Sequence, residues 1–178
     1  YMRLLELVGG PDTRPEVLKE AAHFGEAVLG KGIVWAKDTQ AFIANRIGTY
    51  GICAVFRHME GLTVEQVDAI WGKPMGRPAS AVFRTADLVG LDTLAHVIQG
   101  LYEGCPNDPQ RETFKIPSWL QALIDKKFLG EKSGAGFYKK VKKDDGSSEI
   151  LVFDLHTLDY RSQAKVRFPS LGAARDAE

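Results

Sequence analysis

An asparagine close to the start of a long apolar segment is the first residue of this sequence that could take part in chemistry. Asn45 follows the run Lys37 to Ala44, in which a short strand leads directly into that segment. On a helix, Asn45 shares a face with Gly48 and Thr49, so there is room beside its amide. An amide both donates and accepts hydrogen bonds, which suits it to orienting a substrate oxygen. From the residues alone, an amide that binds only a neighbouring backbone carbonyl is the more common arrangement.

The sequence does not match other common motifs of catalysis and binding. Gly25 to Gly32 approaches the phosphate-binding pattern G-x-x-x-x-G-K-[ST], but it ends in Gly and follows a helix rather than opening one. The four histidines lack metal-ligand spacing, so we expect no metal site. Cys53 and Cys105 are far apart and belong to no C-x-x-C pair, which favours reduced thiols and a cytoplasmic location.

The charge balance and hydropathy exclude several classes of protein. The 178 residues contain 23 Lys and Arg against 23 Asp and Glu, so the formal net charge is zero. A strongly basic nucleic-acid binder is therefore not expected. No run of about 18 apolar residues is present, so we expect no membrane span. The sequence resembles a strand from its first residues, and we expect it to begin inside a larger protein.

The elements that must position these residues fall into three regions. Residues 1–37 predict a strand at Leu4 to Val8, a helix from Pro15 to a C-cap at Gly30, and a second strand at Ile33 to Ala36. This order is typical of a βαβ unit, which cannot bury both faces of its strands alone. We place a domain boundary at residue 38, where the composition changes.

Residues 38–140 predict about five helices separated by Gly and Pro. The segment Ala41 to Glu60 is the expected central helix and is apolar enough to be mostly buried. Thr63 to Gln66 has the form of a capping box and opens the next helix. The other helices are expected at Ala79 to Leu88, Leu91 to Glu103 and Pro117 to Lys127.

Residues 141–178 predict the end of a small hairpin followed by a linker or tail. The hairpin pairs the apolar runs Gly136 to Tyr138 and Ile150 to Phe153 across a turn-prone segment. The residues from Ala173 to Glu178 carry little apolar content, so we expect them to be disordered.

Four segments, in order along the chain, resemble motifs of the 3-hydroxyacyl-CoA dehydrogenase family. Lys37 to Arg46 resembles the signature K-D-x-x-G-F-I-x-N-R at the domain junction of that family, with Ala41 in place of the usual glycine. The other three are Pro74 to Pro78, Ala86 to Asp92 and Lys132 to Tyr138. The resemblance implies a mainly α fold, namely the multi-helical C-terminal domain, preceded by the last strand-helix-strand of a Rossmann-like NAD-binding domain.

The resemblance also implies a reaction: the NAD-dependent oxidation of (S)-3-hydroxyacyl-CoA to 3-ketoacyl-CoA in fatty-acid β-oxidation, with a histidine as general base. Glu6 stands at the position of the acidic partner of that histidine. Asn45 would bind the reacting oxygen or the histidine, and Lys132 matches a lysine that reaches the bound NAD. The family's glycine-rich dinucleotide loop and catalytic histidine would lie upstream of Tyr1, so we expect this chain to be inactive alone.

The implied partners are an acyl-CoA substrate, the upstream NAD-binding domain and a second copy of the chain in a homodimer. Glu149 to Ser170 resembles the linker of long bacterial multifunctional fatty-acid oxidation proteins, in which an enoyl-CoA hydratase region follows. A function of another class stays open, a non-catalytic helical dimerisation or assembly module of a larger protein. The joint presence of Glu6, Asn45 and Lys132 favours the enzyme, while the acyl chain length stays open.

Overall fold

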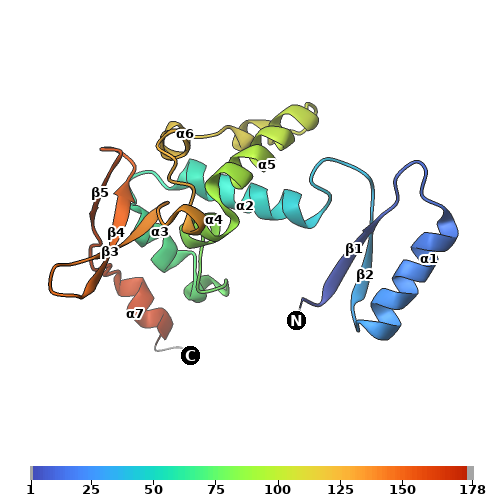
Figure 1. The fold of residues 1–178 in the computed structure, drawn as a ribbon, viewed down its shortest axis with the longest axis horizontal. Coiled ribbons are helices and arrows are strands. Elements are labelled where there is room, and N and C mark those ends of the chain that lie inside the picture. The colour runs from blue at the N-terminus through green and yellow to red at the C-terminus, as the bar shows by residue number, and fades with distance from the viewer. Residues whose placement is uncertain (1, 176–178) are drawn as a thin grey trace.

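The first of two structural regions is a βαβ unit. The structure is a computed structural model that describes residues 2–175. Strand β1 (Leu4–Val8) and strand β2 (Gly32–Ala36) pair in parallel. Helix α1 (Pro15–His23), which connects them in the sequence, lies beside the pair (Figure 1). Helix α1 continues through a single π-helical turn, and Gly30 follows in a left-handed conformation at φ 62°. The predicted strand-helix-strand unit is thus confirmed.

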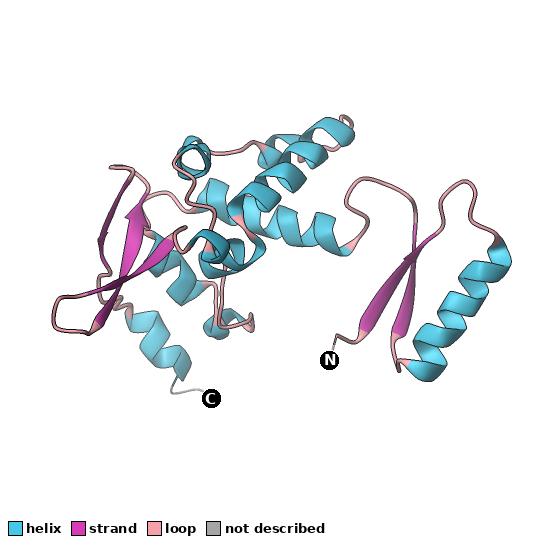
Figure 2. Ribbon diagram, in the orientation of Figure 1, coloured by secondary structure: helices cyan, strands magenta, loops and turns pink. Residues whose placement is uncertain are grey.

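The second region is a helical body of five α-helices in the order in which the sequence predicts them (Figure 2). They are α2 (Ala44–His58), α3 (Val64–Ile70), α4 (Phe83–Val89), α5 (Leu91–Gly104) and α6 (Ser118–Asp125). The predicted capping box opens α3, where the backbone N–H of Thr63 donates to Oε1 of Gln66 at 2.9 Å. No helix within residues 2–175 is both long and apolar enough to cross a bilayer.

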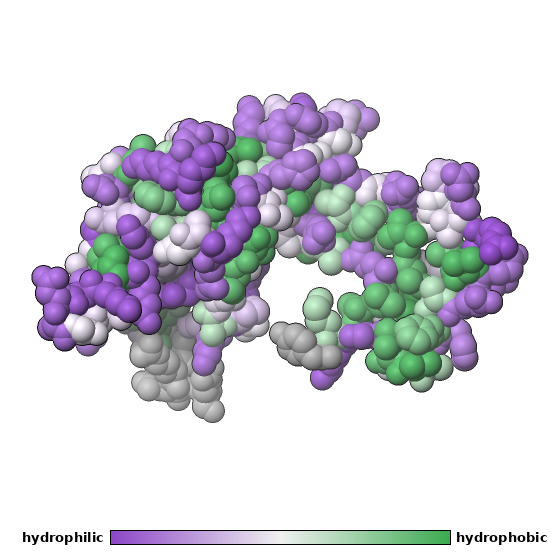
Figure 3. Space-filling view, viewed as in Figure 1, coloured by the Kyte–Doolittle hydropathy of each residue, from purple (hydrophilic) through white to green (hydrophobic). Residues whose placement is uncertain are grey.

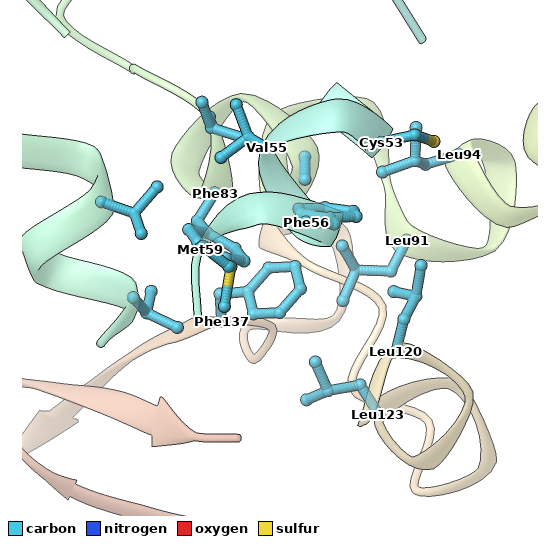
Figure 4. Close-up of a cluster of buried hydrophobic side chains, with 14 of the residues drawn as sticks. Cys53, Val55, Phe56, Met59, Phe83, Leu91, Leu94, Leu120, Leu123 and Phe137 are labelled. Atoms are coloured by element: carbon cyan, nitrogen blue, oxygen red, sulfur yellow. The ribbon is translucent and has the colours of Figure 1, made fainter. Parts of the chain in front are cut away.

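An aromatic cluster forms the centre of this body (Figure 4). The ring of Phe83 lies 5.3 Å from that of Phe56 and 4.6 Å from that of Phe137, and Trp119 meets Phe56 edge-on at 4.9 Å. Such stacked and edge-to-face pairs contribute about 0.5–1.5 kcal/mol each beyond the burial of their area. Since these rings come from α2, α4, α6 and the residue before β3, the cluster joins elements that are distant in the sequence.

A three-stranded antiparallel sheet covers one side of the body, where the sequence predicts only a hairpin. Strands β3 (Tyr138–Lys142) and β4 (Ser148–Asp154) form that hairpin, and β5 (Asp159–Ser162) adds a third strand beside β4. The sequence of β5 does not alternate between apolar and polar residues, so this pattern does not reveal the strand. Val152 and Phe153 of β4 are buried in the aromatic core, and therefore the sheet is part of the body.

The end of the described chain differs from the expected tail. Residues Ala173 to Arg175 complete helix α7 (Pro169–Arg175), which begins with proline, a residue favoured in a first helical turn. The expectation of disorder from Ala173 is therefore wrong for these three residues. The remaining part of the expected tail, residues 176–178, lies outside the described residues.

The central helix differs from its prediction in both its start and its burial. Ala41 and Phe42 have φ values of 60° and 49°, so regular helix begins only at Ala44. Thr49, Cys53 and Phe56 face the core. Ile47 on the opposite side is 67 % exposed, because α2 is apolar on two faces and the body covers only one of them.

Candidate active-site residues

Glu6 joins the βαβ unit to the first turn of α2. It lies in the middle of β1, opposite Val34. One carboxylate oxygen accepts a hydrogen bond from the backbone N–H of Ile43 at 3.0 Å, and the other from that of Ala44 at 2.8 Å. The first amides of a helix have no partner within the helix, and the helix dipole favours a negative charge there. Glu6 thus caps a 15-residue helix from another region of the molecule.

Asn45 is the next residue of the same helical turn, directly after one of the two amides that Glu6 binds. Its side chain is exposed and makes no hydrogen bond to any other residue within 2–175. The structure therefore brings Glu6 and Asn45 to the same end of α2 and leaves the Asn45 amide accessible to a bound molecule.

Arg46 fixes this end of α2 to the helical body. Its guanidinium lies 2.5 Å from a carboxylate oxygen of Asp108, which stands in the loop after α5. Asp108 also accepts the backbone N–H of Gln110 at 2.8 Å. These two hydrogen bonds lower the pKa of Asp108, and the pair raises the pKa of Arg46. Arg46 belongs to the quoted junction signature, but the sequence gives no sign of its partner 62 positions away.

Lys132 lies in a short 3₁₀ turn (Glu131–Ser133) and pairs with a residue at the start of α5. Its Nζ is 2.5 Å from Oδ1 of Asp92, and the two side chains are 48 % and 42 % exposed. This hydrogen bond lowers the pKa of Asp92. No hydrogen bond or ion pair among residues 2–175 joins Lys132 to Glu6 or Asn45. The three predicted site residues therefore form one pair and one separate residue.

Asp87, which sequence reasoning missed, holds the loop that carries Lys132. Its carboxylate accepts the backbone N–H groups of Phe137 at 2.8 Å and Tyr138 at 2.9 Å. A Cβ atom on Gly136 would stand 2.1 Å from this carboxylate, and one on Gly130 would stand 2.3 Å from the Asp87 carbonyl oxygen. Two of the quoted motifs thus meet in space, and Gly136 together with Gly130 allows the close approach.

The surroundings of Asp87 change its acidity. Burial raises the pKa of Asp87 to about 6, although its two backbone donors act in the opposite direction. Gly136, within Lys132 to Tyr138, is the signal in the sequence that marks a close approach. It does not reveal that the approaching group is a carboxylate 50 residues earlier.

A second buried acid, Glu65 on α3, holds the missed strand β5 against the body. Glu65 is 3 % exposed, and its two oxygens accept from the guanidinium of Arg161 at 2.7 and 3.1 Å. Arg161 also reaches Asp154 at 3.2 Å. Burial alone would raise the pKa of Glu65, but its hydrogen bonds outweigh burial and hold the pKa below its ordinary value. This pair is structural and stands apart from the predicted site residues.

The chain thus consists of a βαβ unit whose Glu6 caps the first turn of a multi-helical body. The family described as "3-hydroxyacyl-CoA dehydrogenase, C-terminal domain" matches residues 42–140. This match spans more than half of the chain, and the chain therefore belongs to that family. The predicted family and its multi-helical fold are confirmed.

Relatives and solved structures agree with this assignment. A probable 3-hydroxyacyl-CoA dehydrogenase of Bacillus subtilis is 46 % identical over 100 % of this chain and 22 % of its own length. One of Deinococcus radiodurans is 44 % identical over 81 % of this chain and 41 % of its own length. The crystal structure of M. tuberculosis FadB2 superposes with a TM-score of 0.69 at 30 % identity, covering 79 % of this chain and 48 % of that one. The chain thus spans less than half the length of each of these relatives.

Proposed function

We propose that this chain is part of an NAD-dependent 3-hydroxyacyl-CoA dehydrogenase, which oxidises (S)-3-hydroxyacyl-CoA to 3-ketoacyl-CoA in fatty-acid β-oxidation. The observation that carries the proposal is the meeting of Glu6 with the helix turn that bears Asn45, inside the family's domain junction. The two free thiols, Cys53 and Cys105, favour the cytoplasm as its location.

In this proposal Asn45 orients the reacting oxygen of the substrate. Its amide is exposed, stands in the first turn of a helix, and is not engaged by the other residues in 2–175. The ion pair between Arg46 and Asp108 holds that turn against the body, so the amide is presented from a fixed backbone. A fixed donor retains its position as the substrate approaches the reactive geometry.

Glu6 is the proposed partner of a catalytic histidine supplied by the upstream part of the protein. Its two oxygens already accept one backbone N–H each. A carboxylate has about four acceptor positions, so it retains capacity for an imidazole N–H. Glu6 would then orient the imidazole and stabilise its protonated form, while the α2 amides hold the carboxylate in place.

The residues of this chain fit NAD only in part. Lys132 is a half-exposed cation and suits a phosphate group, and Asp92 holds its Nζ. The residues after β1 form a turn into α1 that lacks the glycine-rich dinucleotide pattern. When bound, NAD would supply the hydride acceptor. We propose that an upstream domain binds most of it, and that this chain is inactive without that domain.

The surface of the βαβ unit supports an upstream domain. Leu4 is 66 % exposed and Trp35 is 59 % exposed, and apolar residues gather over β1, α1 and β2 (Figure 3). Parallel strands are normally covered on both faces and continued by further strands. We propose that the missing neighbours belong to the NAD-binding domain.

A homodimer is the proposed assembly. The outer face of α2 lines an apolar hollow of about 420 Å³ that includes Ile47, Tyr50 and Trp71. Exposed apolar surface of this kind marks an interaction site. Sedimentation at tens of micromolar should show a dimer, and Ile47→Glu should shift it to monomer. A strictly monomeric parent would contradict this part of the proposal.

The reaction is tested with the chain extended by the upstream part of the Bacillus subtilis relative. We expect this protein to oxidise NADH with acetoacetyl-CoA, and Asn45→Ala to lower kcat/KM at least tenfold, a loss of about 1.4 kcal/mol of transition-state stabilisation. Asn107→Ala is the matched control, because Asn107 is the other asparagine of the chain and is also exposed. A folded parent without activity would instead favour the non-catalytic assembly module.

A further inference from the structure

Two hollows beside β3 share the same pair of residues. The larger has a volume of about 480 Å³ and lies between α3, β3 and the segment 163–166. The smaller, of about 430 Å³, lies between α4, β3 and the loop before it. Arg84 and Tyr138 line both, where α3, α4 and β3 converge (Figure 1). None of the site residues proposed above lines either hollow.

Arg84 is held in place by a chain of contacts that begins at a half-buried acid, Asp68. The hydroxyl of Tyr138 donates to Asp68 at 2.9 Å, which fixes the tyrosine ring. The guanidinium of Arg84 lies over this ring, 4.0 Å from its centroid. A cation held on an aromatic face keeps its position without using its N–H donors. The guanidinium is therefore ordered before any ligand arrives.

The two carboxylates that line the larger hollow already accept hydrogen bonds from other residues. Glu65 is bound by the fork of Arg161. Asp68 accepts three backbone N–H groups at the start of α4, from Val82, Phe83 and Arg84, in addition to the Tyr138 hydroxyl. Neither acid has a hydrogen bond to the guanidinium of Arg84.

Two positively charged side chains of the larger hollow have hydrogen-bond donors that bind no other described residue. Within residues 2–175, the guanidinium of Arg84 and the ammonium of Lys165 have no hydrogen-bonded acceptor and no ion-pair partner. Both line the larger hollow. An arginine offers five N–H donors in a planar fork that matches the oxygens of a carboxylate or a phosphate. The smaller hollow also holds two cations, Arg84 and Lys140, and two acids, Asp87 and Glu131. It suits an anion less well, because the Glu131 carboxylate accepts no hydrogen bond from the described residues and its charge faces the hollow unpaired.

We propose that the larger hollow binds the oxyanion group, phosphate or carboxylate, of a small organic molecule. The guanidinium of Arg84 binds the oxyanion through its fork, and Lys165 adds a second charge from the segment 163–166. The volume lies within the range of about 300–1,000 Å³ that is usual for small-molecule sites. This site is separate from the dehydrogenase proposal and does not depend on it.

The test is a titration of the 178-residue chain, labelled with ¹⁵N, followed by NMR at constant ionic strength. Inorganic phosphate and acetate are the two probes. We expect at least one of them to shift the amides of Arg84, Tyr138 and residues 163–166 in a saturable way. Tighter binding of phosphate would specify a phosphate ester as the ligand class, and tighter binding of acetate a carboxylic acid.

Three variants separate this site from general attraction between charges. Arg84→Gln should weaken binding at least fivefold, and Lys165→Gln about twofold to threefold. Lys165 is exposed and its ammonium has no hydrogen bond or ion pair within residues 2–175, so its variant stays informative even if Arg84→Gln is less stable. Arg14→Gln removes the same charge from the βαβ unit and should leave binding unchanged. Equal affinity in all three variants, or no saturable shift at residues 163–166 with either probe, would overturn the proposal.

Discussion

The βαβ unit and the helical body bury their apolar residues to very different extents. Within residues 2–36 only Gly25 is fully buried, while Trp35 and Phe24 remain more than half exposed. In the body, Phe83 and Leu91 have no exposed surface and belong to a cluster that draws on all five helices and the sheet. The body therefore has a core of its own, and the βαβ unit has an apolar surface that still needs a partner.

This difference predicts that residues of the helical body contribute more to the free energy of unfolding than residues of the βαβ unit. Truncating one side chain in each region should give the largest effect. Phe83→Ala should lower the free energy of unfolding by about 3–5 kcal/mol, since it removes a fully buried ring. Trp35→Ala removes a larger but exposed ring and should cost less than about 0.5 kcal/mol. Urea unfolding followed by circular dichroism measures both, and equal losses would show that the two regions share one core.

A second effect concerns pH and is confined to the body. The pKa of Asp87 is about 6 in the folded chain and is near its ordinary value of 3.8 when the chain is unfolded. The folded state therefore binds the proton more tightly, and this stabilisation is lost as pH rises through about 6. The pKa difference corresponds to about 3 kcal/mol between pH 4 and pH 7.

Urea unfolding at several pH values, with Asp87→Asn beside the parent, isolates this contribution. In the parent, Asp87 should make the free energy of unfolding fall as pH rises from 4.5 to 7. In the variant, this contribution to the pH dependence of the free energy of unfolding should be absent, whatever the overall stability of the variant. Parallel pH profiles in the two proteins would contradict the role given to Asp87.

The smallest effect lies at the junction between the two regions. Ala41 occupies the family's glycine position with φ 60°, a conformation that costs a non-glycine residue about 1 kcal/mol. Ala41→Gly should therefore raise the free energy of unfolding by about 0.5–1 kcal/mol. Ala44→Gly, three residues later in regular helix, should lower it by a similar amount. Thermal unfolding would separate the two, and changes of the same sign would refute strain at Ala41.

Local patterns in the sequence predicted most elements, and the misses have physical causes. The strands of the βαβ unit and the five helices follow from periodicity and turn residues. Helix α4 begins at Phe83 rather than Ala79, because Ala81 has φ 50° and Asp68 of α3 caps the amides that follow. Strand β5 was missed because the packing of Tyr160 against Phe153 and the pair of Arg161 with Glu65 hold it, and neither is a local signal.

The candidate site was predictable only through its resemblance to a family. Glu6 and Asn45 carry no distinguishing local pattern, yet the structure places the Glu6 carboxylate on the helix turn of Asn45. The partner of Lys132 is Asp92, which belongs to another quoted motif. Contacts that span 40 or more residues depend on the packing of the whole chain, and one sequence alone does not display them.

Hydrogen exchange tests the contrast between the two regions most directly. In the intact 178-residue chain, mass spectrometry should find the amides of β1 and β2 exchanging at least a hundredfold faster than those of α5, because opening the βαβ unit exposes little buried surface. Adding the upstream domain in the extended protein should slow exchange in β1 and leave α5 unchanged. Equal protection of β1 and α5 in the 178-residue Ile47→Glu chain, which is expected to be monomeric, would contradict the account.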